Sequence, residues 1–329
     1  MEKIQLETDL GKKEVEKKWK GKFLDDSSYE QVLKVTEDTG VMKPGYPLDG
    51  TDVPLAYIMT NVFEDNDLVR NTLASIADVT TMRANASGPI DKEEMEQRGM
   101  KEGVDYKLRT PNSFFIRTKS GKWGMIAYGN EIHSIMVGYK RGRFTGTIDK
   151  SGWCNDNPDK WEKLQNIPYW NERAFKKANP VMFNRQKKWS KRHIREEHRI
   201  KGSSVTTMSA NRYNASQSRA MSAHVDSGDL SAGLTTMCCF REGDYSGAYL
   251  TFPRYGIAID APDNSVIITD SLEVHGVTPI KGSGTRYTCT AYCDSRLATI
   301  GEGRSINSEN PIGHHHRDKK GNLEEFLSD

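Results

Sequence analysis

The spacing of the apolar positions changes near Ser203. From there to about Arg296 the chain is a succession of short apolar, β-branched and aromatic runs separated by Gly, Pro, Asn and Asp. Such runs, bounded by turn residues, predict β-strands. We expect strands over residues 204–213, 234–240, 248–252, 256–260, 265–269, 273–278 and 286–293. Strands this short and this closely spaced indicate a sandwich or jelly roll rather than a parallel sheet with crossover helices.

The upstream half of the chain shows other patterns. Apolar positions at helical spacing predict a helix over residues 63–79. A second helical region over 160–200 is interrupted at Pro168 and Pro180, because proline cannot continue a helix from the preceding turn. Short β-branched and aromatic runs cut by glycines predict hairpins over 110–150.

Together these patterns predict a mainly β protein with flanking helices (α+β), built on a sandwich or jelly-roll core. The core takes residues 203–297, and residues 61–202 buttress it and contribute to substrate binding, so that 61–297 form one structural unit. Residues 1–60 are polar and weakly periodic, which predicts a loosely held N-terminal arm. The charged, Gly/Ser/Asn-rich residues 298–329 predict a mobile C-terminal tail.

Composition and charge exclude few functions. The chain has 329 residues, with 47 Lys and Arg against 45 Asp and Glu, so its net charge is +2. Any contact with nucleic acid must therefore come from a local basic patch. No run approaches the roughly 20 apolar residues that span a bilayer, and the charged start lacks the apolar stretch of a secretory signal. We expect a monomer without membrane contact.

The five cysteines are odd in number, and none forms a Cys-x-x-Cys pair. We therefore expect buried free thiols rather than disulfides or a zinc site. Free thiols in turn predict an intracellular protein, in the cytoplasm or, in a eukaryote, in the nucleus. The cysteines are Cys154, Cys238, Cys239, Cys289 and Cys293.

One candidate metal site joins two predicted strand ends. His224 and Asp226 are separated by one residue, which places both side chains on the same face of a strand. His275 follows much later, near the end of another predicted strand. Two imidazoles and one carboxylate form the facial triad of non-haem Fe(II) oxygenases, whose open positions receive a keto acid and O₂. These three residues are the predicted metal ligands and catalytic centre.

A His-x-Asp string is a weak signal by itself, because it arises by chance at roughly even odds in a chain with eight histidines. The sequence contains a second copy, His316-Arg317-Asp318. That copy lies in the charged tail with no strand around it and no later histidine, so we interpret it as solvated tail.

A keto acid bound to iron through one end leaves a distal carboxylate that needs a cation. Arg286 begins the predicted strand that follows His275, and its planar guanidinium offers two parallel donors. Thr288 points the same way along that strand and could add a hydroxyl. Asn211 and Tyr213, on the strand that enters the His-x-Asp loop, could donate to the same ligand, although core or turn roles suit them equally.

Four motifs occur in order within residues 203–296: H-x-D-x-G-D, G-x-Y-x-G-x-Y-x-x-F-P, D-x-x-x-x-H-G and R-x-T. Together they resemble the oxygenase domain of the TET/J-binding-protein (TET/JBP) dioxygenases, which oxidise the 5-methyl group of pyrimidines in nucleic acid. Residues 81–200 resemble that family in general layout alone. The cysteine-rich zinc-binding region and long barrel insert of the vertebrate-type members have no counterpart here, which indicates a compact, single-domain member.

The resemblance implies a double-stranded β-helix (jelly-roll, cupin-like) core. It also implies an enzyme that uses Fe(II), with 2-oxoglutarate and O₂ as cosubstrates. It assigns iron to the three predicted metal ligands and the distal carboxylate of 2-oxoglutarate to Arg286. Arg219 occupies a position that lines the cosubstrate pocket in some relatives. Asp229 matches a polar position that touches the flipped base in some relatives, and a carboxylate can accept from the exocyclic amine of cytosine, which thymine lacks.

The substrate that the resemblance implies is 5-methylcytosine in DNA, converted to 5-hydroxymethylcytosine. The same chemistry on thymine, a free nucleobase, a protein side chain or a small metabolite stays open, as does a non-catalytic nucleic-acid-binding jelly roll. The segment Arg185–Lys201 contains eight Lys or Arg and two Glu, and is the candidate for contact with DNA phosphates. The alternative for this segment is a solvated helix face. Arg83 and Asn85 are candidates for a loop over the substrate, and an ordinary polar turn is the alternative.

Overall fold

The structure is a computed structural model. It describes residues 1–44, 53–77, 106–110, 113–117, 123–126, 133–141, 146–215, 220–231 and 233–298. Within these ranges no helix is both long and apolar enough to cross a membrane.

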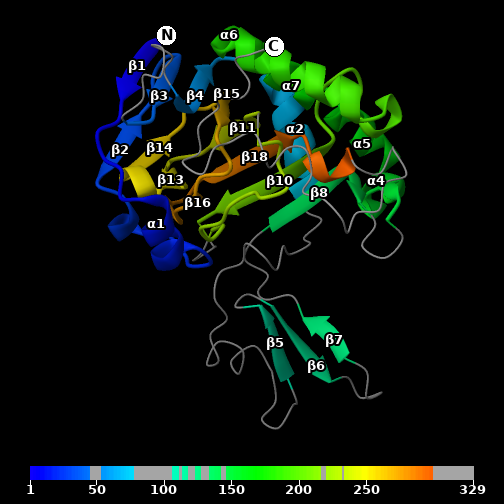
Figure 1. Cartoon of the computed structure of the whole chain (residues 1–329), viewed down its shortest axis with the longest axis horizontal. Coiled ribbons are helices and arrows are strands. Elements are labelled where there is room, and N and C mark those ends of the chain that lie inside the picture. Colours follow the sequence, from blue (N-terminus) through cyan, green and yellow to red (C-terminus); the bar gives the residue numbers. More distant parts are fainter. Residues whose placement is uncertain are drawn as a thin grey trace.

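The largest sheet has nine strands in the order β1-β3-β4-β15-β11-β18-β10-β8-β9 (Figure 1). Its central strands pair in antiparallel register, and β1 pairs with β3 in parallel. The bounds in this order are Glu2–Gln5, Thr39–Met42, Pro54–Thr60, Ser265–Thr269, Thr235–Glu242, Thr285–Tyr292, Thr207–Asn214, His133–Arg141 and Ile148–Lys150.

A second sheet of four strands, β16-β13-β14-β2, lies across from the largest sheet. Its bounds are Gly276–Val277, Leu250–Phe252, Ile257–Asp260 and Gln31–Lys34. Two smaller sheets complete the strand inventory of the described residues: β12 (Tyr245–Gly247) with β17 (Ile280–Gly282), and β5-β6-β7 (Tyr106–Thr110, Ser113–Arg117 and Trp123–Ile126).

The strand order is that of a double-stranded β-helix. After β10 the chain reaches His224, which an isolated β-bridge joins to His275. It then enters the large sheet at β11, the small sheet at β13 and β14, the large sheet at β15, the small sheet at β16 and the large sheet again at β18. In the large sheet this gives the antiparallel order β10-β18-β11-β15, and in the small sheet β16-β13-β14. The predicted jelly-roll core is confirmed, and each of its predicted strands is present within a few residues of its expected bounds.

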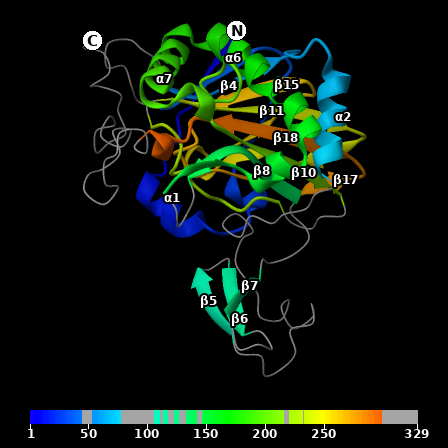
Figure 2. The ribbon, with the colours of Figure 1, turned by 90° about the vertical axis from the view of Figure 1, so that its right-hand side faces the viewer.

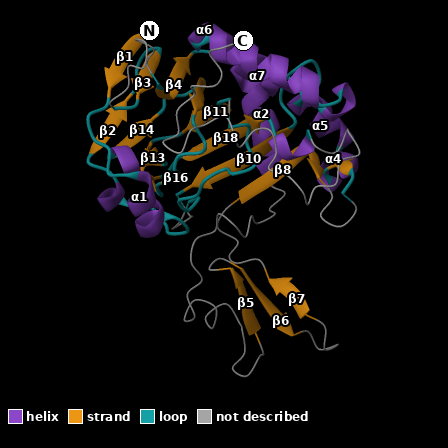
Figure 3. Cartoon of the chain, viewed as in Figure 1, coloured by secondary structure: helices purple, strands orange, loops and turns teal. Residues whose placement is uncertain are grey.

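Helices cover the outer face of the large sheet. Helices α2 (Asn66–Ala77) and α6 (Ile167–Ala178) contact its strands directly, and α7 (Pro180–His193) packs beside α6 (Figures 2 and 3). Two further short helices, α4 (Gly152–Asp156) and α5 (Pro158–Leu164), precede α6. The predicted breaks at proline are confirmed, because Pro168 and Pro180 occupy the first turns of α6 and α7, where their missing N–H removes no helical hydrogen bond.

The alternation of side chains along β11 separates two cores. Cys238 and Phe240 pack under the helices, together with Phe175 of α6. Cys239 instead packs between the two sheets, together with Phe252. Since β18 pairs with β11 in register, with Cys239 opposite Thr288, the same alternation turns Arg286 and Thr288 toward the interior of the jelly roll. All five cysteines are buried, as the sequence predicted.

The N-terminal residues correct the predicted polar arm. Strand β4 lies inside the large sheet, where it pairs with β15, and six of its seven residues are buried. Strand β2 adds to the small sheet beside β14. The prediction was wrong because β1, β2 and β3 have only four residues each, too short for an apolar period, and gain their stability from pairing with distant strands. The limits of the domains remain predictions.

Candidate active site

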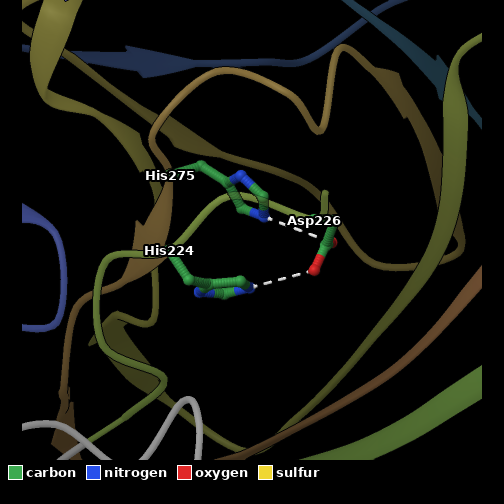
Figure 4. A group of neighbouring side chains, drawn as sticks. All are labelled: His224, Asp226 and His275. Carbon is green, nitrogen blue, oxygen red and sulfur yellow. Dashed lines mark ion pairs between the residues drawn. The ribbon is translucent and has the colours of Figure 1, made fainter. Parts of the chain in front are cut away.

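The structure brings the three predicted metal ligands together. The ligand atoms of His224, Asp226 and His275 all lie within 4.8 Å of one another. Each histidine directs Nε2 at the carboxylate, at 3.7 Å from Asp226 Oδ1 for His224 and 3.7 Å from Asp226 Oδ2 for His275 (Figure 4). Two imidazoles and one carboxylate that face a common point fit a facial triad for Fe(II).

The backbone fixes the relative position of the two histidines. His224 N–H donates to His275 O at 2.8 Å, and His275 N–H donates to His224 O at 3.0 Å. This exchange of hydrogen bonds is the closely spaced pair of an antiparallel ladder. It places the two rings side by side, with centroids 4.5 Å apart.

The other ring nitrogen of each histidine is also occupied. His224 Nδ1 lies 2.6 Å from the Ser222 carbonyl oxygen, and His275 Nδ1 lies 2.9 Å from the Glu273 carbonyl oxygen. A carbonyl oxygen can only accept, so Nδ1 must carry the proton and donate in both cases. The tautomer that results leaves the Nε2 lone pair for a metal, as is usual when an outer hydrogen bond orients a ligating histidine.

A buried ion-pair cluster holds the loop that precedes His275. Lys43 Nζ lies 2.7 Å from Asp270 Oδ2 and 2.7 Å from Glu273 Oε1. Arg254 Nη1 lies 3.1 Å from Glu273 Oε2, and its other nitrogens pair with Asp9 at 2.7 Å. The cluster therefore fixes the residue whose carbonyl oxygen orients His275.

The N-terminal segment also contacts the strand of the first ligand. Gly21 N–H donates to Ala223 O at 2.7 Å, and Ala223 N–H donates to Lys22 O at 2.8 Å. Helix α1 (Lys12–Trp19) buries Val15 against Ala223 and Val274, the neighbours of the two histidines. None of these contacts was predicted from the sequence, because residues 1–60 are polar and only weakly periodic.

Arg286, the predicted anchor for the distal carboxylate of 2-oxoglutarate, lies inside the jelly roll. Its side chain is buried, its Nε donates to Cys239 Sγ at 3.2 Å, and its Nη1 donates to the Ala248 carbonyl oxygen. Nη2 is buried without a hydrogen-bond partner in the described part of the chain. A buried unpaired donor is costly, so its presence fits a ligand with a carboxylate acceptor.

Tyr245 lies within range of the Arg286 charge, although the sequence did not predict it as a site residue. Its hydroxyl is buried and, among the described residues, has no hydrogen-bond partner. Burial raises the pKa of this hydroxyl, so that it stays a donor, and the Arg286 charge acts on it in the opposite direction. Tyr245 is the first tyrosine of the G-x-Y-x-G-x-Y motif, which was the one available signal.

The other predicted cosubstrate residues on described strands line the same interior face. Tyr213 pairs across the sheet with Arg286, and Asn211 pairs with Thr288. Asn211 Nδ2 donates to Thr288 Oγ1 at 3.3 Å, so these two side chains hydrogen-bond to each other. Their contact with 2-oxoglutarate stays a prediction, and Arg219 lies outside the described residues.

Asp229 lies on the loop that follows the metal carboxylate. It is buried, and one oxygen, Oδ2, accepts from the hydroxyls of Thr235 and, at 2.7 Å, of Ser271. No hydrogen bond reaches Oδ1 from the part of the chain that the structure describes. Burial raises the pKa of Asp229 well above its ordinary range, and the nearby Asp226 charge adds to this rise. Arg83 and Asn85, the other two substrate candidates, lie outside the described residues.

The basic segment Arg185–Lys201 forms most of α7 and the turn after it. Gln186 Oε1 accepts from Leu234 N–H at 3.0 Å, and Trp189 packs against Leu230, next to Asp229. The segment thus lies beside the loop of the candidate site. Part of its charge is paired, since Lys201 lies 3.0 Å from Glu162.

Residues 136–295 match the family Tet_JBP, described as the oxygenase domain of the 2OGFeDO superfamily. The match includes the three metal ligands and Arg286. The chain carries a TET/JBP oxygenase domain. The resemblance seen in the four motifs is thereby confirmed, and the chain is an Fe(II)- and 2-oxoglutarate-dependent oxygenase of this type.

The chain is similar in structure to three solved structures, each at low sequence identity. NgTET1 in complex with 5mC DNA is 13% identical, with a TM-score of 0.48, and the alignment covers 82% of this chain and 84% of that chain. A 2OG-Fe(II) oxygenase family oxidoreductase from Burkholderia pseudomallei is 10% identical, with a TM-score of 0.36 and coverage of 72% and 85%. The viral collagen prolyl hydroxylase vCPH from Paramecium Bursaria Chlorella virus-1 is 10% identical, with a TM-score of 0.29 and coverage of 74% and 96%. Comparison with the curated proteins finds no match.

The residues of the TET/JBP domain fit its cofactors. Iron(II) would be held by the Nε2 atoms of His224 and His275 and by the Asp226 carboxylate, while 2-oxoglutarate would place its distal carboxylate at Arg286 Nη2. The donor set of two neutral nitrogens and one carboxylate suits Fe(II) and leaves coordination positions open for 2-oxoglutarate and O₂.

Proposed function

We propose that this TET/JBP oxygenase hydroxylates the 5-methyl group of a pyrimidine in DNA, with 5-methylcytosine as the preferred base. When bound, iron with 2-oxoglutarate and O₂ supplies the oxidising chemistry, and succinate and CO₂ are the coproducts. The chain's own residues bind, orient and exclude water. We also propose an intracellular monomer, since five buried thiols suit a reducing compartment.

Asp229 is the observation that carries the choice of base. Its Oδ2 accepts hydrogen bonds from the hydroxyls of Thr235 and Ser271, which fix the carboxylate in place. Its Oδ1 can therefore serve as an acceptor for a ligand. The exocyclic amine of cytosine is a donor at the position where thymine has an acceptor. A fixed acceptor on the loop that follows the metal carboxylate therefore favours a 5-methylcytosine ring held with its methyl group toward the metal site.

The burial of the site favours a base that has left its helix. His275 is buried, and His224 and Asp226 are only partly exposed. A methyl group inside a stacked duplex cannot reach such a site, so the nucleotide must flip out at a cost of a few kcal/mol. Exposed lysines and arginines of the segment Arg185–Lys201, beside the site loop, would contribute contacts to the phosphates.

The decisive experiment is nucleoside mass spectrometry of DNA after incubation with the protein, Fe(II), 2-oxoglutarate and O₂. Oligonucleotides that carry 5-methylcytosine should yield 5-hydroxymethylcytosine and an equal amount of succinate. The His224→Ala variant is the matched control and should yield neither. Succinate production that responds to a peptide or a metabolite but to no methylated oligonucleotide would overturn the proposal.

A further inference from the structure

Cys239 and Arg286 meet across two neighbouring strands of the large sheet. Cys239 on β11 pairs with Thr288 on β18, and Arg286 lies two residues before Thr288, on the same face of β18. The two side chains are therefore diagonal neighbours on the interior face of the jelly roll. Arg286 Nε donates to Cys239 Sγ at 3.2 Å. Arg286 is 2% exposed and Cys239 is fully buried.

A second contact fixes the plane of the guanidinium. Arg286 Nη1 donates to the carbonyl oxygen of Ala248. Ala248 has a left-handed backbone with φ 50°, which a residue with a Cβ adopts only where its surroundings impose it, and its N–H donates to Pro279 O at 3.1 Å. Because a guanidinium is planar, two nitrogens held in place also fix the third, Nη2.

The acceptor that holds Arg286 Nε is neutral, which sets this arginine apart. Three other arginines of the described residues each pair with a carboxylate: Arg241 with Asp260, Arg254 with Asp9 and Glu273, and Arg296 with Asp294. In the part of the chain that the structure describes, no carboxylate pairs with Arg286, and its Nη2 has no hydrogen-bond partner. A carboxylate in the place of the thiol would neutralise the guanidinium and compete with an anionic ligand, whereas a thiol orients it and leaves its charge in force.

We propose that Cys239 is a positioning residue that orients Arg286 for the distal carboxylate of 2-oxoglutarate, and so favours keto acids that carry such a carboxylate. The sulfur holds Nε and the Ala248 carbonyl oxygen holds Nη1, which leaves the Nη2 donors for the ligand. The inference rests on Arg286 as the carboxylate anchor. It concerns the cosubstrate and does not depend on which base or other group is oxidised.

Cys238 provides a matched control at the adjacent position. It is as fully buried as Cys239, but the alternation along β11 turns it to the other core, where it packs under the helices and pairs with Cys289 on β18. Cys238→Val and Cys239→Val therefore remove the same group from neighbouring residues of one strand. Only the second substitution removes a contact of Arg286.

The test measures dissociation constants for two keto acids by isothermal titration calorimetry, with Fe(II) bound and O₂ excluded. One keto acid is 2-oxoglutarate, and the other is 2-oxopentanoate, which has a methyl group in place of the distal carboxylate. The variants are Cys239→Val, Cys239→Ser, Cys238→Val, Arg286→Ala and the double variant Cys239→Val with Arg286→Ala. Thermal unfolding shows whether each variant is folded.

We expect Cys239→Val to raise the Kd for 2-oxoglutarate roughly fivefold, because the guanidinium loses one of the two contacts that orient it. The Kd for 2-oxopentanoate should not change. Cys239→Ser, whose hydroxyl is also an acceptor, should stay within about twofold of the wild type for both keto acids. Cys238→Val should bind as the wild type does, and Cys239→Val should have no further effect in the Arg286→Ala background.

Three outcomes would overturn the inference. If Cys239→Val weakens both keto acids equally, the substitution disturbs the whole site and Cys239 is a core residue. If its Kd for 2-oxoglutarate is unchanged or lower, the sulfur does not orient the anchor. If Arg286→Ala itself leaves that Kd unchanged, the anchor lies elsewhere, and the proposed oxidation of 5-methylcytosine is unaffected. If Cys239→Val does not fold, Cys239→Ala, which removes the sulfur without added volume, takes its place under the same criteria.

Discussion

Lys43 and Glu273 form a buried ion pair with an Nζ–Oε1 distance of 2.7 Å, although 230 residues separate them in the sequence. The carbonyl oxygen of Glu273 accepts from His275 Nδ1, so this pair connects the N-terminal segment to a metal ligand. The same lysine also pairs with Asp270. Lys43 is thus a residue through which the N-terminal segment supports the metal site.

Replacement of Lys43 should weaken both the fold and the metal site. Lys43→Met removes the cation that Asp270 and Glu273 share, although Glu273 keeps Arg254, and this should lower the free energy of unfolding by roughly 3–5 kcal/mol. Because the lost contact lies just outside a metal ligand, affinity for Fe(II) should fall about tenfold or more. Urea unfolding and metal titration measure the two effects.

The control for this prediction is Lys177→Met. Lys177 pairs with Asp38 at 2.8 Å, but its side chain is 71% exposed, so its loss should cost less than about 1 kcal/mol. It should leave metal affinity unchanged. Equal metal affinity in Lys43→Met and the wild type, under conditions where both are folded, would show that the cluster supports the fold alone.

The Asp9–Arg254 pair should make stability depend on pH in acid. The hydrogen bond from Arg254 holds the pKa of Asp9 below its ordinary value of 3.8, despite an opposing effect of burial. A carboxyl whose folded pKa is lowered stabilises the fold above its unfolded pKa, and this contribution is lost as the pH falls through the folded pKa. The difference in unfolding free energy between wild type and Asp9→Asn should be full above about pH 5 and shrink below about pH 4. A difference that is the same in neutral and in strongly acidic buffer would contradict the assignment.

Removal of a metal ligand should abolish turnover without unfolding the protein. His224→Ala or Asp226→Ala breaks the facial triad, whereas the jelly-roll core lies elsewhere, between the two sheets. Succinate production should fall to background, with circular dichroism and thermal unfolding close to wild type. If either variant released succinate at close to the wild-type rate, the substituted residue would not be a metal ligand.

Arg286 should determine the affinity for 2-oxoglutarate. Arg286→Ala leaves the distal carboxylate buried without a cation, which costs roughly 2–5 kcal/mol and raises the KM at least tenfold. Tyr245→Phe removes one donor and should raise the KM by roughly fivefold. Tyr255→Phe is the control, since the Tyr255 hydroxyl is likewise buried without a partner among the described residues but lies in the core between the sheets. An unchanged KM in Arg286→Ala would indicate that Arg219, rather than Arg286, binds the distal carboxylate of 2-oxoglutarate.

Asp229 should set the preference between bases. Thymine would oppose its O4 acceptor to the carboxylate in a dry pocket, at a cost of roughly 1–3 kcal/mol, which corresponds to about a tenfold to hundredfold preference for 5-methylcytosine. Asp229→Asn should erode this preference, because an amide can present either a donor or an acceptor. Competition between two oligonucleotides that differ only in this base, followed by nucleoside mass spectrometry, measures it. Equal turnover of both by the wild type would contradict the assignment.

The sequence was sufficient to predict the cluster of His224, Asp226 and His275, because its signal is local. His224 and Asp226 flank a single residue, and His275 ends a strand whose turns and apolar runs are visible in the sequence. Lys43 carried no such signal, since its partners Asp270 and Glu273 lie near the opposite end of the chain. Tyr245 was visible as part of a motif, but only its burial without a partner among the described residues shows that it can serve a ligand.

Strand β4 leaves the ribosome long before its partner β15, since Thr60 pairs with Ser265, far along the chain. The stretch of chain between β2 and its partner β14 is longer still, because Gln31 pairs with Ile257. Such non-local pairing slows folding and leaves strand edges open meanwhile. A nascent chain therefore cannot complete the contacts that support the metal site until β14 and β15 have been synthesised and have paired with β2 and β4.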